Sequence, residues 1–142
     1  MLIPEYIVGL VDGEGSFTVY IKDPKSNTAR TRRVRAEPKF YIKLMERDRA
    51  ILFEIQKYFG CGNIYLQKDK RPTHNDCYRY EVTKREDLRR TIIPFFEKYE
   101  LRLVSKRKDF KLFCSLLSMI ESGKHLRSAG LKQMYVIKQK MH

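Results

Sequence analysis

The chain has 142 residues, of which 42% are hydrophobic and 33% charged; this composition predicts one folded domain spanning 1–142 and excludes a disordered chain. Thirty Lys and Arg against 17 Asp and Glu leave a net charge of +13, which favours a polyanionic partner such as nucleic acid over an acidic membrane surface. No apolar run approaches the roughly 18 residues of a membrane span, and no signal peptide is recognisable, so we expect an intracellular protein without a membrane partner.

The stretch IVGLVDGEG, residues 7–15, is the hardest to explain by folding alone. Its apolar density predicts a buried helix, yet Gly9 and Gly13 each cost about 1 kcal/mol of helix propensity. Their spacing of four places both on one face, where another backbone can come close. Asp12 and Glu14 follow at the end of the helix, where the dipole is already negative. We interpret these acids as presented to something positive, for which a metal ion is the simplest candidate.

Period-two alternation after this helix predicts four strands, each with one apolar and one polar face. They are expected at 16–22, 33–44, 61–68 and 77–83. Pro38 lies within the second of them, which indicates an edge position or a bulge at that point. In the third strand, Ile64 and Leu66 are expected to face the core.

Helices are predicted between and after the strands. One is introduced by Asp48 and closed by Gly60, and another should break or kink at Pro94. Two more are expected at about 105–122 and 128–140. The order α-β-β-α-β-β-α, followed by more helix, predicts an α+β fold with a four-stranded antiparallel sheet and helices on one of its faces.

The other face of this sheet carries basic, aromatic and amide side chains, and acids are nearly absent from it. Such side chains along strands suit the reading of base edges in a DNA major groove, whereas the competing interpretation is a solvated sheet face. Together with basic loop residues, the predicted contacts to double-stranded DNA are Tyr20, Lys22, Arg30, Arg32, Arg33, Arg35, Lys39, Tyr41, Lys43, Tyr65, Gln67, Lys68, Lys70 and Arg79.

Residues 7–15 resemble, position for position, the signature of the LAGLIDADG homing endonucleases. The order of elements and the segments 59–65, 92–101 and 105–110 are also similar to that family, so the resemblance covers almost the whole chain. A single signature copy resembles the members that act as homodimers, in which the two sheets form a saddle over DNA. The resemblance implies a homodimeric, site-specific, double-strand DNA endonuclease with a near-palindromic target.

The same resemblance implies a set of site residues. Glu14 is expected to bind the catalytic Mg²⁺, or another hard divalent ion such as Mn²⁺, together with the backbone carbonyl of Gly13. Lys84 is the expected catalytic lysine, with Lys43 as the second choice. Asp12 is left open between a structural role at the helix end and support of the metal site as a catalytic residue. The expected dimer interface comprises Val8, Gly9, Asp12 and Gly13.

Some features stay open. The chain departs from a common family pattern at Leu44, where a polar residue such as Gln is expected, so the group that positions the attacking water is not assigned. The basic run 106–108 fits either phosphate contacts or the solvated start of a helix. The alternatives to an endonuclease are a non-cleaving DNA-binding protein or intron RNA maturase of the same fold, and a basic ribosome-associated protein. The acid at Glu14 argues against a copy that has lost cleavage.

Overall fold

The computed structural model describes residues 1–25, 35–68, 70–71 and 75–142. Its sheet contains β1 (Gly15–Ile21), β2 (Ala36–Met45), β3 (Asn63–Gln67) and β4 (Cys77–Val82), all antiparallel and in the order β1-β2-β4-β3. The longer helices are α1 (Pro4–Glu14), α2 (Ala50–Phe59), α5 (Val104–Glu121) and α6 (Ser128–Lys138). The predicted α+β fold and order of elements are confirmed.

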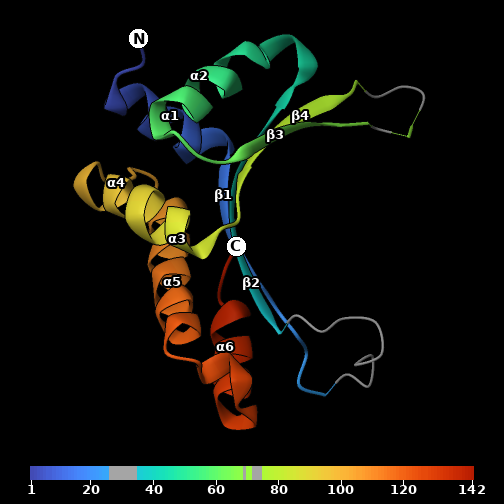
Figure 1. Cartoon of the computed structure of the whole chain (residues 1–142), viewed down its shortest axis with the longest axis vertical. Helices are drawn as coiled ribbons and strands as arrows, with labels where there is room; N and C mark the ends of the chain where they lie inside the picture. The colour runs from blue at the N-terminus through green and yellow to red at the C-terminus, as the bar shows by residue number, and fades with distance from the viewer. Residues whose placement is uncertain (26–34, 69, 72–74) are drawn as a thin grey trace.

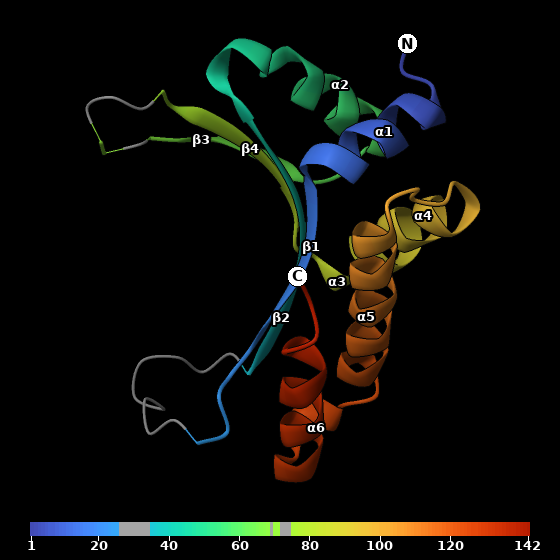
Figure 2. The same cartoon turned by 180° about the vertical axis from the view of Figure 1, so that it is seen from behind.

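The sheet is strongly curved and all the helices lie on its convex side (Figure 1). Helix α1 packs against β1 and β2, α2 against β3 and β4, and α5 and α6 against the β1 side. The opposite view shows the same single helical layer, so the concave face is left open between the two ends of the sheet (Figure 2). This arrangement confirms that one face of the sheet is free of helices.

The core fixes which side chains face outward. The ring of Phe17 on β1 lies 5.1–5.5 Å, centroid to centroid, from the rings of Phe40, Phe96, Phe110 and Phe113. All five rings are buried. The odd-numbered residues of β1 and the even-numbered residues of β2 therefore face the helices. The intervening residues of each strand therefore face the concave side.

Pro38 is accommodated because of the stagger between strands. It pairs with Val19 of β1, whereas β2 meets β4 only from Phe40 onward. Among the described strands, β2 thus has a single neighbour at Pro38, although it is central further along. The edge position that the proline indicated is confirmed locally.

Three details differ from the sequence-based expectations. Asp48 does not cap α2: it belongs to the 3-10 turn η2 (Glu46–Asp48), and the N-cap residue is Arg49. Gly60 does end that helix, with a φ of 71° that favours glycine. Leu66 is 37% exposed rather than in the core, because it pairs with the half-buried Tyr78 at an end of the sheet that the helices do not cover.

Pro94 does not break its helix. The segment runs as α3 (Arg85–Asp87), one wide π turn η3 (Leu88–Ile92) and α4 (Ile93–Lys98). The wider turn immediately before Pro94 accommodates a residue that lacks the N–H of a normal helical hydrogen bond. Among the described residues, none of the helices combines the length and apolar character needed to cross a bilayer.

Candidate active site and nucleic-acid interface

The junction between α1 and β1 holds Glu14 at a fixed point beside the sheet. Gly15 begins the strand directly after the helix, and a Cβ on it would lie 2.7 Å from the Val11 Cγ1 atom. Only glycine fits this tight change of direction. Glu14 is exposed, and its carboxylate has neither a hydrogen bond nor an ion pair to any residue that the structure describes. This carboxylate is therefore free to bind a ligand.

Asp12 has a different role in the structure. Its carboxylate accepts hydrogen bonds from the backbone N–H groups of Arg102, at 3.0 and 3.1 Å, and Leu103, at 3.2 Å. Leu103 is the N-cap residue of α5, so the acid at the negative end of α1 lies at the positive end of another helix. These hydrogen bonds give Asp12 a structural role, because they anchor α5 to the α1–β1 junction.

Lys106 is brought by the fold to Glu14's end of the sheet. It lies in the first turn of α5, is half-buried, and donates a hydrogen bond from Nζ to the carbonyl oxygen of Gly15. The structure does not place Lys84 there. That residue lines a polar hollow of about 310 Å³ at the start of β3, with Gly60, Cys61, Gly62, Asn63, Thr83 and Asp87. The geometry favours Lys106 over Lys84 as a group acting beside Glu14.

Lys43, the second choice, is placed by strand register. Gly15 pairs with Ile42, so the next residue of β2 lies level with Glu14 and exposes its side chain on the concave side. Leu44 points the other way and packs against the core. That position therefore supplies no polar group to the site.

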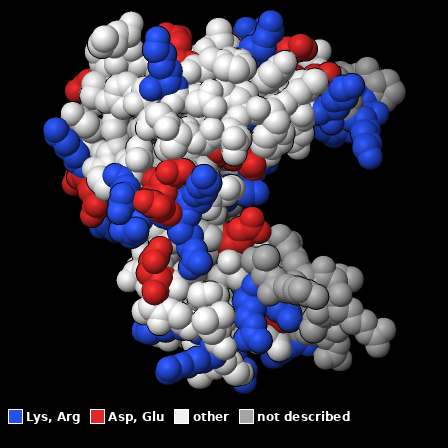
Figure 3. Space-filling model, viewed as in Figure 1, with Lys and Arg blue, Asp and Glu red and all other residues white. Residues whose placement is uncertain are grey.

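Most of the predicted DNA contacts gather on the concave face. Lys43 and Lys70 come together around a hollow of about 220 Å³, which among the described residues is lined by Lys43, Gln67, Lys68, Lys70, Arg71 and Cys77. A second hollow of about 350 Å³ lies beside β1, lined by Thr18, Tyr20, Ile21, Glu37, Lys39, Tyr135, Lys138 and Gln139. The space-filling view shows this side of the molecule hollowed, with Lys and Arg side chains at both ends of the hollow (Figure 3).

The C-terminal helix also contributes to this face, which the sequence interpretation did not anticipate. Lys138 of α6 donates a hydrogen bond to the Thr18 hydroxyl at 3.1 Å, and burial lowers the pKa of its ammonium group. The Arg35 guanidinium donates a hydrogen bond to the Leu126 carbonyl oxygen at 3.3 Å. The backbone N–H of Lys22 donates one to the Arg35 carbonyl oxygen. Arg30, Arg32 and Arg33 lie outside the described residues.

Two acids lie on the concave face, from which acids were expected to be nearly absent. Glu37 and Glu81 both occupy positions on it, because each lies between residues that turn toward the helices. Glu81 Oε1 is 3.2 Å from Lys39 Nζ and 3.0 Å from Arg79 Nε. The face is therefore basic with an acid at its centre, rather than uniformly basic.

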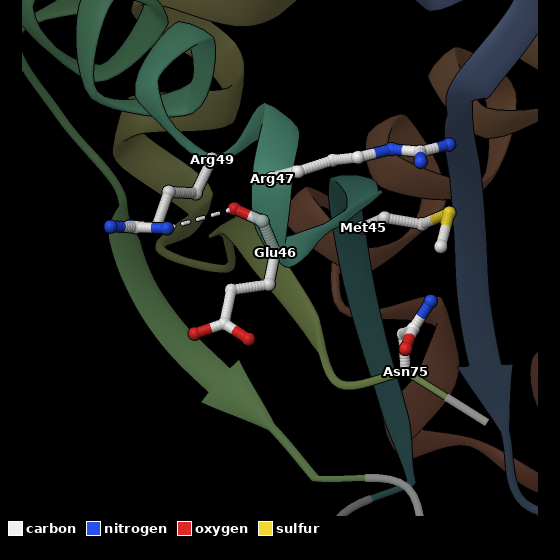
Figure 4. Close-up of a pocket in the computed structure, with 5 residues that line it drawn as sticks. All are labelled: Met45, Glu46, Arg47, Arg49 and Asn75. Atoms are coloured by element: carbon white, nitrogen blue, oxygen red, sulfur yellow. Dashed lines mark hydrogen bonds between the residues drawn. The ribbon is translucent and has the colours of Figure 1, made fainter. Parts of the chain in front are cut away.

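Two arginines beyond β2 were missed by the sequence interpretation. Met45, Glu46, Arg47, Arg49 and Asn75 line a hollow of about 350 Å³ where β2 ends. The side chains of Arg47 and Arg49 point in opposite directions, and Arg49 donates to the Glu46 carbonyl oxygen at 3.1 Å (Figure 4). These cations enlarge the basic surface at the end of the sheet from which Glu14 projects.

The outer face of α1 is exposed, and its two glycines present no side chain there. Among the residues that the structure describes, and apart from the adjoining backbone of α1, a Cβ on Gly9 or Gly13 would meet no atom within 4 Å. Tyr6, with 49% of its surface exposed, continues this stripe at helical spacing. Beside it, Leu103 and Val104 at the start of α5 are 49% and 83% exposed. Val8 is buried within the protomer, so it does not form part of this surface.

A divalent ion fits this site only if the protein and DNA both supply its ligands. Within the described ranges, no three His, Cys, Asp or Glu side chains gather into a metal-binding cluster. Mg²⁺, however, accepts one or two carboxylates and completes its octahedron with waters and phosphate oxygens. The free carboxylate of Glu14 beside the Gly13 backbone meets that requirement when DNA supplies further oxygen ligands.

Comparison with known proteins gives a consistent set of relatives. The LAGLIDADG endonuclease family model matches residues 7–117. The chain is 38% identical over 133 residues to probable intron-encoded endonuclease 2 of Neurospora crassa, covering 93% of this chain and 27% of that protein. It is 29% identical over 126 residues to homing endonuclease I-ApeII of Aeropyrum pernix, covering 89% and 69%. The chain thus spans about a quarter to a third of the first curated relatives.

Solved structures resemble the whole fold. The homing endonuclease I-TnaI superposes with a TM-score of 0.80 at 35% identity, over 99% of this chain and 88% of that one. I-GzeII in complex with its DNA target gives a TM-score of 0.80 at 31% identity, over 100% and 44%. I-SmaMI, bound to uncleaved DNA in the presence of calcium ions, gives 0.81 at 28% identity, over 100% and 45%. The same unit therefore occurs both as nearly a whole chain and as less than half of a longer one.

Proposed function

Since this chain belongs to the LAGLIDADG endonuclease family, we propose that it cleaves double-stranded DNA at a specific site by metal-dependent phosphodiester hydrolysis, as a homodimer. The observation that carries the proposal is the free Glu14 carboxylate, held at the edge of a basic, concave sheet face. DNA fits that face because strand-borne cationic, aromatic and amide side chains can reach both phosphates and base edges in the major groove.

The proposed site works from fixed groups. Glu14 and the Gly13 carbonyl would hold a hard divalent ion, which would neutralise charge at the phosphate and make a bound water more acidic. The Lys106 ammonium, fixed by the Gly15 carbonyl, keeps further N–H donors for a phosphate oxygen. It thereby stabilises the negative charge that develops as the P–O bond breaks. Asp12 keeps α5, and with it Lys106, in register with Glu14.

Two copies are proposed because one chain supplies a single site residue of each kind. Cutting both strands of a duplex takes two scissile phosphates, and a C2 dimer presents the same groups to each. The bare stripe of Gly9 and Gly13, flanked by exposed Leu103 and Val104, supplies a surface for this contact. The solved chains of which this one covers 44% and 45% have room for a second unit of the same size, and a second copy of this chain would supply that unit here.

The proposal is tested by incubating the purified protein with a randomised duplex DNA library and Mg²⁺, and sequencing the ends that appear. We expect double-strand ends at one near-palindromic sequence, lost with EDTA and restored by Mg²⁺ or Mn²⁺. Selective binding without new ends would identify a non-cleaving DNA-binding protein instead. Preference for a structured intron RNA over every duplex would identify a maturase.

The choice between the two lysines gives a direct prediction. We expect Lys106→Met, which keeps an apolar stem but removes the charge, to lower the single-turnover cleavage rate roughly 10²- to 10³-fold. Lys84→Met removes the same charge from the hollow beside β3 and should change that rate less than about threefold, with any loss confined to DNA affinity. A larger rate loss in Lys84→Met than in Lys106→Met would restore Lys84 as the catalytic lysine.

A further inference from the structure

A compact cluster of four side chains occupies the middle of the concave face. This Glu81 cluster comprises Lys39 and Tyr41 of β2 and Arg79 and Glu81 of β4. The Glu81 carboxylate pairs with both cations through one oxygen, and the Arg79 guanidinium lies over the Tyr41 ring with Cζ 3.6 Å from the centroid. The Glu81 and Arg79 side chains are only 13% and 17% exposed. The cluster is thus set into the sheet, unlike freely solvated surface pairs.

A fifth residue completes the environment of the acid. The hydroxyl of Tyr65 on β3 hydrogen-bonds to Glu81; burial first, and then this bond, raise the pKa of the phenol. Glu81 therefore links side chains from three adjacent strands at the point where β2, β4 and β3 run side by side. So many contacts leave the carboxylate, and the arginine bound to it, with little rotamer freedom.

A carboxylate here is unfavourable for DNA affinity alone. It lowers the charge of the cluster from +2 to +1 and repels the phosphates that this face is proposed to bind. What the carboxylate contributes instead is a fixed position for the Arg79 guanidinium. Arg79 Nε lies buried 3.0 Å from Glu81 Oε1 without the alignment of a hydrogen bond, and the guanidinium lies over the Tyr41 ring, so the two terminal Nη groups are the donors left to face DNA. Two parallel N–H donors on a fixed plane match the O6 and N7 acceptors of guanine.

We propose that Glu81 is a positioning residue for sequence recognition: it holds Arg79 over Tyr41 so that the guanidinium reads a guanine in the major groove opposite the β2–β4 pair. The inference rests on the proposed function, because it takes the concave face to be the DNA-binding face. It adds that specificity at this base pair depends on an acid that itself repels DNA.

The test compares Glu81→Gln with Glu37→Gln, which removes the same charge from the same face. Binding would be measured against the duplex selected by the wild type and against every single-base-pair variant of it, over a range of salt concentrations. For Glu81→Gln we expect the preference for guanine at one position per half-site to fall about tenfold or more. The slope of log affinity against log salt should steepen by about one per protomer. Glu37→Gln should steepen the slope without changing any base preference.

Arg79→Lys gives a second, independent variant, because it keeps the charge but not the planar pair of donors. It should lose the same guanine preference, at the same position, as Glu81→Gln. Unchanged base preferences in either variant would overturn the inference, and so would an equal loss of affinity for all sequences, which is what a purely structural ion pair would give. A wild type that shows no sequence preference would overturn the proposed function as well, so the wild-type measurement separates the two failures.

Discussion

Glu14→Gln is expected to lower the rate of DNA cleavage at least about 10³-fold while leaving DNA affinity equal to that of the wild type or slightly higher. The carboxylate is exposed and free of protein partners, so its loss removes no contact that holds the fold. Gln is nearly isosteric but is a much weaker ligand for a hard divalent ion, and removing the negative charge relieves repulsion from the phosphates. Single-turnover cleavage and equilibrium binding of the same duplex would measure the two effects separately.

Glu5→Gln is the matched control for this experiment. Glu5 is an exposed glutamate in the first turn of the same helix, at the end opposite Glu14. Its substitution removes the same charge and should cost at most about 1 kcal/mol of stability through the helix dipole, with cleavage unchanged. Cleavage by pure Glu14→Gln at the wild-type rate would remove Glu14 from the mechanism, and a loss of binding equal to the loss of cleavage would make it a DNA contact instead.

Local sequence patterns were sufficient to predict which residues of a strand or helix share a face. Alternation along 16–22 assigned the faces of β1 correctly, because a strand packed on helices buries every second side chain. The same rule placed Lys43 and Gln67 on the concave face, where they line one hollow. The glycines of α1 were predicted to lie on one open face, and each is bare in the folded protomer. These inferences depend only on period and residue type.

Contacts between distant segments were not accessible in this way. Asp12 meets backbone groups 90 and 91 residues away, and Lys106 meets Gly15 across 91 residues. Lys106 was recognised only as part of a basic run at the start of a helix, whereas its role depends on where α5 packs against the α1–β1 junction. Lys84 was preferred because it follows a strand, yet the chain turns there into α3, and Lys84 lines the hollow at the start of β3.

The pairing register of the strands explains the remaining difference between the sequence-based expectation and the structure, which concerns the acid on the concave face. Alternation assigns Glu81 to the concave face, but only the pairing of Tyr41 with Glu81 and of Lys43 with Arg79 shows which cations surround it. The net positive charge of the face therefore does not reveal that an acid lies at its centre. That acid holds Arg79 in an ion pair, and on the proposal above it is this fixed arginine that adds base recognition to phosphate binding.

Gly9→Val should separate the two protomers while leaving each one folded. Apart from the adjoining backbone of α1, no described residue of the protomer lies within 4 Å of a Cβ at Gly9, so that Cβ causes no clash in the isolated chain. In the proposed dimer the same position faces the partner's helix at backbone distance, and overpacking a close contact costs about 1–3 kcal/mol. The two-fold axis applies that cost twice, so the dimer should weaken by about 2–6 kcal/mol, or roughly 30- to 10⁴-fold in its dissociation constant.

Sizing with light scattering would follow the oligomeric state of the wild type, Gly9→Ala and Gly9→Val, with thermal unfolding measured in parallel. We expect a graded loss of dimer, an unchanged or slightly higher unfolding midpoint under conditions that favour monomers, and double-strand cleavage that disappears with the dimer. Ser115→Val places the same side chain on an exposed position of α5 and should remain dimeric and active. A wild type that is monomeric both free and on its target, or a Gly9→Val protein that stays dimeric and cuts normally, would contradict the homodimer and leave α1 as a core helix with an unexplained bare face.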